Sequence, residues 1–295
     1  MWASWSTSSP KCFGDRMPAE VESSRRTVIV TGNCQSRFLF RCLRRNTTIQ
    51  DAYEPVFIRN RGHKGIDSGD DADIVRCRFL LEQIGHKTSD LPSRELLPAD
   101  CTVIRYPVVW LNSLWPTHID EPRNRPSPEY PRGTFPYGDS IILRLLDQGL
   151  TPEEASAAFL AGKLSDHVDL GRFHEINAAK ARMLDGRADL KFGTYILERF
   201  RSERLFVNHN HPAPGMLRFM ADSIAAAIGF EGLELGFPRS TRDGIGPMHV
   251  PIHPEVAEFF QLDWYDPDEA YRWYDHEFSA GEYYRRYAAM DYPGA

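Results

Sequence analysis

A short turn carrying a cysteine is the part of the sequence best suited to chemistry. Gly32-Asn33-Cys34-Gln35 follows the apolar run 27–30 and precedes residues 36–45, whose apolar side chains recur at helical spacing. This pattern predicts a strand, a tight turn and an amphipathic helix. A helix N-terminus offers free N–H groups and partial positive charge, which favour a thiolate at Cys34 or an anionic ligand beside it. The competing interpretation is that Cys34 is a small packing residue.

The neighbours of Cys34 suggest acyl chemistry. Open α/β sheets bind ligands at the carboxyl ends of their strands, which is where this turn is predicted to lie. The side-chain amides of Asn33 and Gln35 are hydrogen-bond donors that could stabilise a developing oxyanion.

A second cluster, Asn208-His209-Asn210-His211-Pro212, follows the apolar run 205–207. One histidine there is a candidate base for a thiol or hydroxyl nucleophile. Side chains alternate along a strand, so only one histidine is expected to face Cys34 if the strand continues. We favour His211, because Pro212 fixes the chain as it leaves the site, and we assign His209 and Asn210 to the substrate or oxyanion. Alternatively, this is a loop that bonds only to its own backbone.

His249 and His253 form a third cluster between prolines. Together with His209 and His211 they could supply metal ligands, but no acidic or cysteine ligand stands at partner spacing. We therefore expect no metal and place His253 on the substrate side.

Arginines line the polar face of the helix that follows Cys34. Arg37, Arg41 and Arg44 recur along this face, and guanidinium groups match phosphate oxygens bidentately. A solvated helix face is the alternative. Lys64, in a Gly-containing segment at 61–65, is a further phosphate candidate. The nucleotide motifs G-x-G-x-x-G and G-x-x-x-x-G-K-[ST] are absent.

Composition limits the classes of protein that could carry these residues. The 295 residues are 42% hydrophobic, which is enough for a real core, and the net charge of −6 argues against nucleic-acid binding. No apolar run approaches the roughly 20 residues of a membrane span, and no signal peptide is recognisable. Five irregularly spaced cysteines indicate free thiols. We expect a cytoplasmic protein.

Short apolar runs alternate with helical patterns along the chain. Runs at 56–58, 74–75, 103–104 and 205–207 predict buried strands, and 151–161, 170–201 and 216–228 predict helices, the second broken near Gly186 and Gly193. The Pro-rich segment 121–136 is a surface loop or the wall of a site. We predict an α/β fold: a mostly parallel central sheet flanked by helices, flavodoxin- or SGNH-like, with a helical insertion and a helical C-terminus. The predicted division is a flexible leader (1–25), the main domain (26–265) and an aromatic-rich extension (266–295).

The order of several short blocks resembles the WcbI family of polysaccharide-biosynthesis proteins over roughly residues 26–264. The blocks are Gly32-Asn33-Cys34-Gln35, Ala72-Asp73-Ile74-Val75, Val103-Ile104-Arg105-Tyr106-Pro107, Tyr137-Gly138-Asp139, Thr151-Pro152-Glu153-Glu154-Ala155, residues 204–212 and Ile252-His253-Pro254-Glu255-Val256. The resemblance implies an acetyltransferase of bacterial capsule assembly that binds coenzyme A. It favours Cys34 as a catalytic or cofactor-contacting residue and places Gly32, the arginines and Lys64 beside the cofactor.

The resulting hypothesis is transfer of an acetyl group from acetyl-coenzyme A, as co-substrate, to a sugar hydroxyl. Either Cys34 takes the acetyl group and passes it on with His211 as base, or His211 deprotonates the hydroxyl for direct attack. Two alternatives stay open. One is an esterase acting on acylated glycans, suggested by a weaker likeness of the Cys34 turn to the Gly-Asp-Ser turn of SGNH esterases. The other is a non-catalytic glycan-assembly protein, suggested by the aromatic C-terminus.

Overall fold

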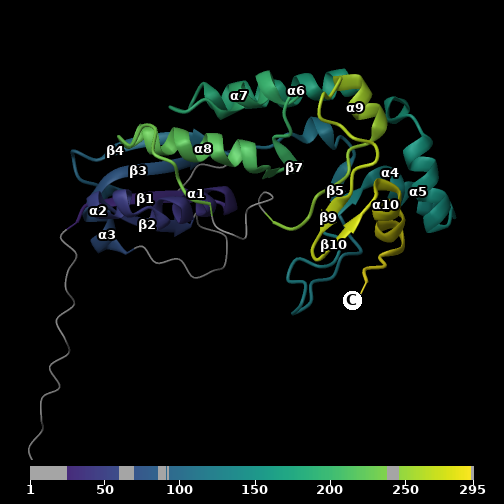
Figure 1. The fold of residues 1–295 in the computed structure, drawn as a ribbon, viewed down its shortest axis with the longest axis horizontal. Coiled ribbons are helices and arrows are strands. Elements are labelled where there is room, and N and C mark those ends of the chain that lie inside the picture. Colours follow the sequence, from purple (N-terminus) through teal and green to yellow (C-terminus); the bar gives the residue numbers. More distant parts are fainter. Residues whose placement is uncertain (1–24, 60–69, 86–90, 92, 238–245, 294–295) are drawn as a thin grey trace, which may run out of the picture.

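A parallel sheet forms the core of the first half of the chain (Figure 1). The computed structural model describes residues 25–59, 70–85, 91, 93–237 and 246–293. Within these residues the central sheet has the order β2-β1-β3-β4 with every pairing parallel. Its strands are β1 (Thr27–Gly32), β2 (Glu54–Arg59), β3 (Cys77–Ile84) and β4 (Thr102–Pro107). The predicted α/β class with a mostly parallel central sheet is confirmed.

The connections place Cys34 at the point where the winding of the sheet reverses. From β1 the chain runs through α1 (Cys34–Arg45) and α2 (Thr47–Ala52) to β2 on one side. It then returns through α3 (Asp71–Val75) to β3, on the other side of β1. Ligands of open α/β sheets bind at such a switch point, beyond the carboxyl ends of the strands. Cys34 directly follows this end of β1.

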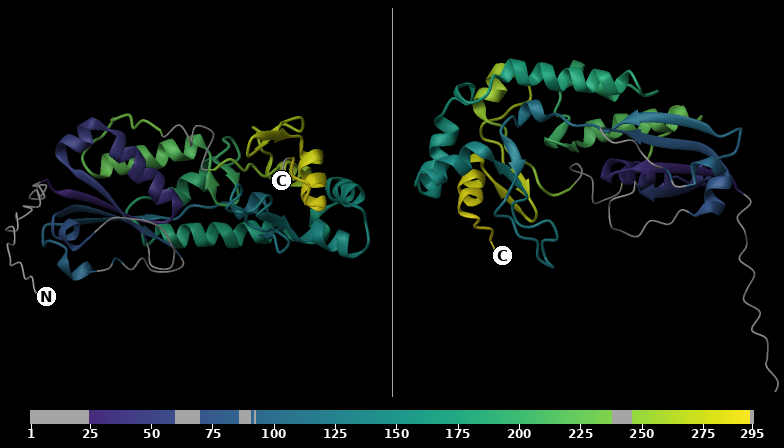
Figure 2. Two further views of the ribbon diagram at one scale, coloured as in Figure 1. Left: turned by 90° about the horizontal axis from the view of Figure 1, so that it is seen from below. Right: turned by 180° about the vertical axis from the view of Figure 1, so that it is seen from behind.

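The two faces of the sheet bury two separate apolar clusters, because successive side chains of a strand point to opposite faces. Val28 and Val30 belong to the larger cluster, which includes α1 and α8 (Pro214–Ala227). Ile29 belongs to the smaller cluster, which includes Ile74 of α3 and Leu80 of β3. Figure 2 shows α1 and α8 running beside the strands. The sheet thus packs apolar side chains on both faces, and a ligand site is expected at the carboxyl ends of its strands.

The predicted strand at 74–75 is wrong, because these residues end a short helix. Asp70 accepts a hydrogen bond from the backbone N–H of Asp73 at 3.0 Å, and the Asp73 carboxylate accepts one from the N–H of Asp70 at 3.2 Å. This reciprocal capping starts α3. The strand begins only at Cys77.

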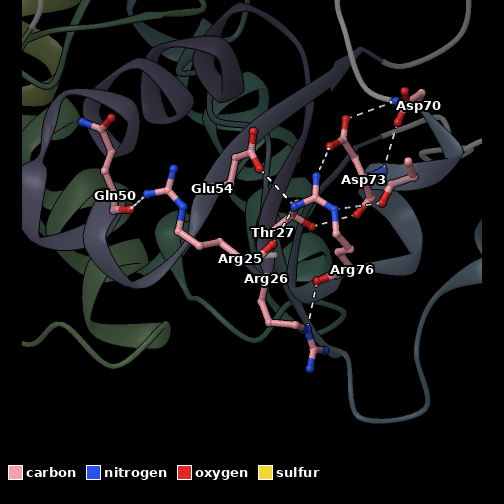
Figure 3. A network of polar contacts seen from close by, with 9 residues as sticks. Arg25, Arg26, Thr27, Gln50, Glu54, Asp70, Asp73 and Arg76 are labelled. Carbon is pink, nitrogen blue, oxygen red and sulfur yellow. Dashed lines mark hydrogen bonds and ion pairs between the residues drawn. The ribbon is translucent and has the colours of Figure 1, made fainter. Parts of the chain in front are cut away.

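A polar network fastens the amino ends of the strands (Figure 3). Arg76 pairs with Asp73 at 2.8 Å and with Glu54 at 3.0 Å, and its carbonyl oxygen accepts a hydrogen bond from Nε of Arg26 at 2.9 Å. These contacts join β1, β2 and α3 at the end of the sheet opposite to Cys34. The network is therefore structural and leaves the carboxyl ends for chemistry.

The second half of the chain adds α4 (Ser140–Asp147), α5 (Pro152–Ala161), α6 (Leu170–Asp185), α7 (Phe192–Arg199) and α9 (Pro254–Phe260). Helices α6 and α7 contact β4, whereas α4, α5 and α9 lie beyond the sheet (Figure 1). The predicted helix at 151–161 is confirmed, with Thr151 and Glu154 capping each other. The predicted break at Gly186 is also confirmed, whereas Gly193 lies inside α7. A Cβ on Gly193 would stand 2.8 Å from the carbonyl oxygen of Ala181, so this glycine lets α6 and α7 pack closely.

Two hairpins and the last helix lie next to α4 and α5 (Figures 1 and 2). The strands are β5 (His118–Asp120) with β6 (Tyr137–Asp139), and β9 (Tyr271–Trp273) with β10 (His276–Phe278), followed by α10 (Ala280–Ala289). The hydroxyl of Tyr287 in α10 donates to Glu121 at 2.6 Å and accepts from the backbone N–H of Asp139 at 2.8 Å. The C-terminal helix therefore braces the hairpin that carries Tyr137.

The strand predicted at 205–207 forms, but outside the central sheet. It is β7 (Phe206–Asn208), and it pairs antiparallel with β8 (His211–Pro212). No helix of the described segments is long and apolar enough to cross a membrane.

Candidate functional site

The turn before α1 is shaped by its glycine and closed by its asparagine. Gly32 has φ of +150°, and a Cβ there would stand 2.0 Å from Oγ of Ser36 and 2.6 Å from Oε1 of Gln83. Only glycine fits this contact. Oδ1 of Asn33 caps the helix by accepting from the N–H of Gln35 at 2.9 Å. Its amide NH₂ group has no hydrogen-bond partner among the described residues, so it is available to a substrate oxygen.

Cys34 occupies the first position of α1 and is exposed to solvent. The other cysteines within the described ranges are less accessible: Cys42 and Cys77 are buried, and Cys101 is intermediate. Burial raises the pKa of the Cys42 thiol to about 12 and is the main cause of a similar rise for Cys77. Cys12 lies outside the described residues. Cys34 thus combines an accessible thiol with the N-terminus of a helix.

Gln35 ties this turn to two distant segments. Its side-chain Nε2 donates to the carbonyl oxygens of Val109 at 2.7 Å and Asn210 at 3.0 Å. Its Oε1 accepts from the N–H of Val109 at 3.0 Å and from Nε2 of Gln83 at 3.2 Å. Both amide hydrogens are therefore donated within the protein. In this arrangement Gln35 positions the site and has no hydrogen left for a substrate oxyanion.

The histidine cluster sits on a tight turn, which changes how its side chains face. Asn208 and His211 are paired residues of the β7–β8 hairpin, so the strand does not continue through the cluster. The premise that His209 and His211 point opposite ways along a strand fails here. Both rings contact Tyr137, with centroid distances of 5.5 Å for His209 and 6.0 Å for His211.

His211 is buried and bonded on one ring nitrogen. Its Nδ1 lies 3.0 Å from Nδ2 of Asn208 and 3.3 Å from the hydroxyl of Tyr137. Burial lowers the pKa of His211 to about 4, and the nearby guanidinium of Arg132 adds to this shift. His211 is therefore neutral at neutral pH.

His209 packs in a stack of rings. It lies on His118 with centroids 3.8 Å apart and an interplanar angle of 22°. Burial, followed by the charges of His118 and His211, lowers the pKa of His209 to about 3. His209 is therefore also an uncharged imidazole.

Tyr137 connects the thiol to the histidines, and sequence reasoning missed its role. Burial raises its pKa to about 12, and Cys34 lies near enough for its charge to add to the shift. Arg132 opposes the shift and hydrogen-bonds with the Tyr137 side chain. The available signals were the Tyr137-Gly138-Asp139 block and the Pro-rich segment before it, which contains Arg132. Nothing in the sequence singled out His118 or Arg132.

A pocket opens beside the stacked histidines. Its lining is aromatic with a few polar groups, and it includes Trp115, His118, Tyr137, Asp139, Phe159, His209, His253, Tyr283, Tyr284 and Tyr287. Burial raises the pKa of Asp139 to about 6, against the hydrogen bonds that it accepts from Thr117 and the start of α4. Ring faces beside a few polar groups are the kind of lining that ligand pockets have.

His253 lines this pocket but is bonded on both nitrogens. Its Nε2 lies 2.8 Å from the carbonyl oxygen of Phe159, and its Nδ1 accepts from the N–H of Glu255 at 3.1 Å. His253 can therefore contact a ligand with its ring only. No group of three or more candidate ligands that could hold a metal occurs in the segments that the structure describes.

The arginines of α1 share an exposed face with Cys34. Residues 34, 37, 41 and 44 are three or four positions apart, so they follow one side of the helix. Arg41 and Arg44 are exposed and Arg37 is half-buried, whereas Phe38, Leu39, Cys42 and Leu43 face the core. Lys64 lies outside the described residues.

Fold and site together define an α/β protein with an accessible cysteine at the switch point of its sheet. This cysteine begins a helix that carries arginines, and it lies near Tyr137, which lines the pocket. The family model for polysaccharide biosynthesis enzyme WcbI matches residues 27–233, and the chain belongs to this family. No curated protein sequence matches.

One solved structure is similar over most of the chain. It is described as WcbI, a novel polysaccharide biosynthesis enzyme, in its native form without a disulfide bond between coenzyme A and one of its cysteines. The TM-score is 0.64 with 91% of each chain covered, at 18% sequence identity. At this identity the likeness establishes the fold.

Proposed function

We propose that this protein is an acetyltransferase that moves an acetyl group from acetyl-coenzyme A to a sugar hydroxyl in bacterial capsular or other surface polysaccharide biosynthesis. One observation carries the proposal: the exposed thiol of Cys34 begins the helix that carries the arginines, and it lies near Tyr137, which contacts His209 and lines the pocket. The arginine face of α1 suits an anionic donor, and the aromatic, histidine-lined pocket suits a sugar. Membership of a family of polysaccharide biosynthesis enzymes supports the same conclusion.

The donor is proposed to lie along α1. Coenzyme A carries a pyrophosphate and a 3′-phosphate, which guanidinium groups bind with charge-assisted hydrogen bonds. If the thiol of coenzyme A lies at Cys34, Arg41 and Arg44 are about 10 and 15 Å further along the helix axis. The phosphates of the cofactor can reach these positions. The similar structure is described as being without a disulfide bond between coenzyme A and one of its cysteines. We propose that Cys34 is the counterpart of that cysteine in this chain.

Two routes use the same groups. In the first, the Cys34 thiolate attacks the thioester carbonyl and coenzyme A leaves as a thiolate. The sugar hydroxyl then attacks acetyl-Cys34, and the carbon–sulfur bond breaks to return the Cys34 sulfur. In the second, the sugar hydroxyl attacks the thioester of acetyl-coenzyme A directly, with Cys34 and the amide of Asn33 around the carbonyl. Both routes release coenzyme A and transfer the hydroxyl proton to a thiolate. Cys34 and one histidine of the β7–β8 turn, His211 or His209, are the proposed catalytic residues, with Asn210 and His253 on the substrate side.

A transfer assay tests the proposal. The protein is incubated with acetyl-labelled acetyl-coenzyme A and a mixture of methyl glycosides and nucleotide sugars, and the products are separated by mass. We expect label in a sugar ester, and slower transfer by Cys34→Ala. Label released only as acetate, with no thermal stabilisation by coenzyme A, would instead indicate an esterase. A protein trapped with labelled Cys34 would select the first route.

A further inference from the structure

The two histidines of the β7–β8 turn differ in which nitrogen they can use. The side chain of Asn208 is held in one orientation: its Oδ1 accepts from the N–H of His211 at 3.0 Å, and its Nδ2 donates to the carbonyl oxygen of Met248 at 2.9 Å. The remaining hydrogen of Nδ2 therefore points to Nδ1 of His211 at 3.0 Å. An amide N–H needs an acceptor, so Nδ1 of His211 carries no proton.

This bond fixes the tautomer of His211. A neutral imidazole has one hydrogen, and with Nδ1 as acceptor that hydrogen is on Nε2. The lone pair of Nδ1 faces Asn208 and the hydroxyl of Tyr137, which lies 3.3 Å away. His211 can donate a hydrogen bond from Nε2, but it presents no free lone pair to a substrate hydroxyl.

The ring nitrogens of His209, unlike Nδ1 of His211, are not occupied by hydrogen bonds within the described residues. Its backbone is fixed, because its carbonyl oxygen accepts from the N–H of Leu111 at 2.8 Å. Its ring is held by the stack with His118, yet its ring nitrogens have no hydrogen-bond partner among the described residues. The ring lines the pocket, and its low pKa keeps it unprotonated at neutral pH.

Several polar groups around His209 already form hydrogen bonds within the protein. The hydroxyl of Tyr284 donates to the carbonyl oxygen of Pro251 at 2.9 Å, and the hydroxyl of Tyr287 donates to Glu121 at 2.6 Å. Oδ1 of Asp139 accepts from the N–H groups of Ile141 and Ile142 at 2.8 and 3.2 Å. A hydroxyl group that enters the pocket therefore meets in His209 a ring nitrogen that forms no hydrogen bond with the described residues.

Building on the proposed function, we infer that the pocket is the acceptor subsite, where His209 takes the proton of the sugar hydroxyl and His211 is restricted to donating a hydrogen bond. The hydroxyl oxygen forms a bond to the acetyl carbonyl carbon while its proton passes to His209. The carbon–sulfur bond then breaks, and the departing thiolate, of Cys34 or of coenzyme A, receives that proton. The ester and the thiol are the products, and His209 is neutral again.

Substitution by glutamine separates the two roles. Glutamine retains an N–H donor near the position of Nε2 but has no basic nitrogen. We expect His209→Gln to lower kcat for transfer about 100-fold or more, the scale of a lost general base, with the KM for acetyl-coenzyme A unchanged. His211→Gln is expected to lose about tenfold. His276→Gln on β10, outside this pocket, is the matched control and should transfer like the wild type.

The assay follows free thiol released from acetyl-coenzyme A, with and without a mixture of methyl hexosides. In His209→Ala, dissolved imidazole should restore sugar-dependent thiol release, which a purely structural role would not allow. If wild type and His209→Gln release thiol at similar sugar-dependent rates, or if His211→Gln is the more damaged variant, the assignment of His209 is overturned. If the wild type shows no sugar-dependent release, the proposed function fails.

Discussion

The side-chain nitrogen of Gln35 donates to the carbonyl oxygen of Asn210 across 3.0 Å, joining residues 175 positions apart. This bond ties the first turn of α1, which carries Cys34, to the turn that carries both histidines. Since Gln35 is almost fully buried, the bond is protected from water. The distance between the proposed nucleophile and the proposed base therefore depends on a residue that touches neither substrate.

Replacing Gln35 by methionine should remove the hydrogen bonds that join α1 to Val109 and to Asn210. The change keeps the volume but leaves the backbone groups of Val109 and the carbonyl oxygen of Asn210 without their partner. A buried unsatisfied group costs about 1–3 kcal/mol, so the free energy of unfolding should fall by at least that amount. Urea unfolding measures it. Unchanged stability would show that water or a neighbour replaces the amide.

Cys34 should be the first of the described cysteines to react with iodoacetamide. It is exposed, whereas Cys42 and Cys77 are buried and their thiol pKa values are about 12. Peptide mapping after brief labelling near neutral pH measures the order. Coenzyme A should protect Cys34, and labelling of Cys42 or Cys77 should require unfolding. Early labelling of either buried thiol in the folded protein would contradict the packing described above.

Arg41→Ala should weaken coenzyme A binding by about 1.5–3 kcal/mol, the scale of a charge-assisted hydrogen bond. Salt should weaken wild-type binding more than binding to the variant, since one screened interaction has been removed. Calorimetric titration gives both values. Arg182→Ala removes an exposed arginine from α6 and serves as the control. Equal affinities of Arg41→Ala and wild type for coenzyme A would show that Arg41 does not bind its phosphates.

The buried neutral state of His211 predicts a loss of stability in acid. Its pKa is 6.5 in the unfolded chain and about 4 when folded, so below pH 6.5 the unfolded chain binds the proton more readily. The stability is present at pH 7 and is lost as the pH falls toward 4, by about 3 kcal/mol at most. Asp139 has the opposite effect on the free energy of unfolding. Folding raises the pKa of its carboxyl group, so its protonation favours the folded protein as the pH falls.

Comparison of wild type with His211→Gln isolates the histidine, since Asp139 contributes to both proteins. Urea unfolding at pH 7 and pH 4.5 should show a smaller loss in the variant. Parallel losses would mean that His211 is protonated in the folded protein, and the tautomer argued above would then be wrong.

The local part of the site could be predicted from the sequence. The run 27–30, the glycine turn and the helical spacing after Cys34 each depend on neighbouring residues, and all three form as expected. The strand predicted at 74–75 was wrong, because capping by Asp70 starts a helix there despite two β-branched residues. The alternation assumed for His209 and His211 failed because the chain turns between β7 and β8.

The remainder depends on contacts between distant segments. Tyr137 comes from a hairpin that α10 braces through Tyr287, and nothing near Tyr137 in the sequence reveals that it lies close to Cys34. The hydrogen bonds from Gln35 to backbone carbonyl oxygens could not be predicted either, because their acceptors lie 74 and 175 positions away in the sequence. Tertiary packing, which periodicity does not encode, decides these roles.

A crystal structure of the complex with coenzyme A tests the central claim most directly, because the claim concerns where donor and acceptor lie relative to Cys34. We predict the coenzyme A sulfur beside Cys34, its phosphates on Arg37, Arg41 or Arg44, and the pocket lined by His118 and His209 left open for the sugar. Coenzyme A filling that pocket, or phosphates bound away from α1 with the sulfur remote from Cys34, would contradict the account.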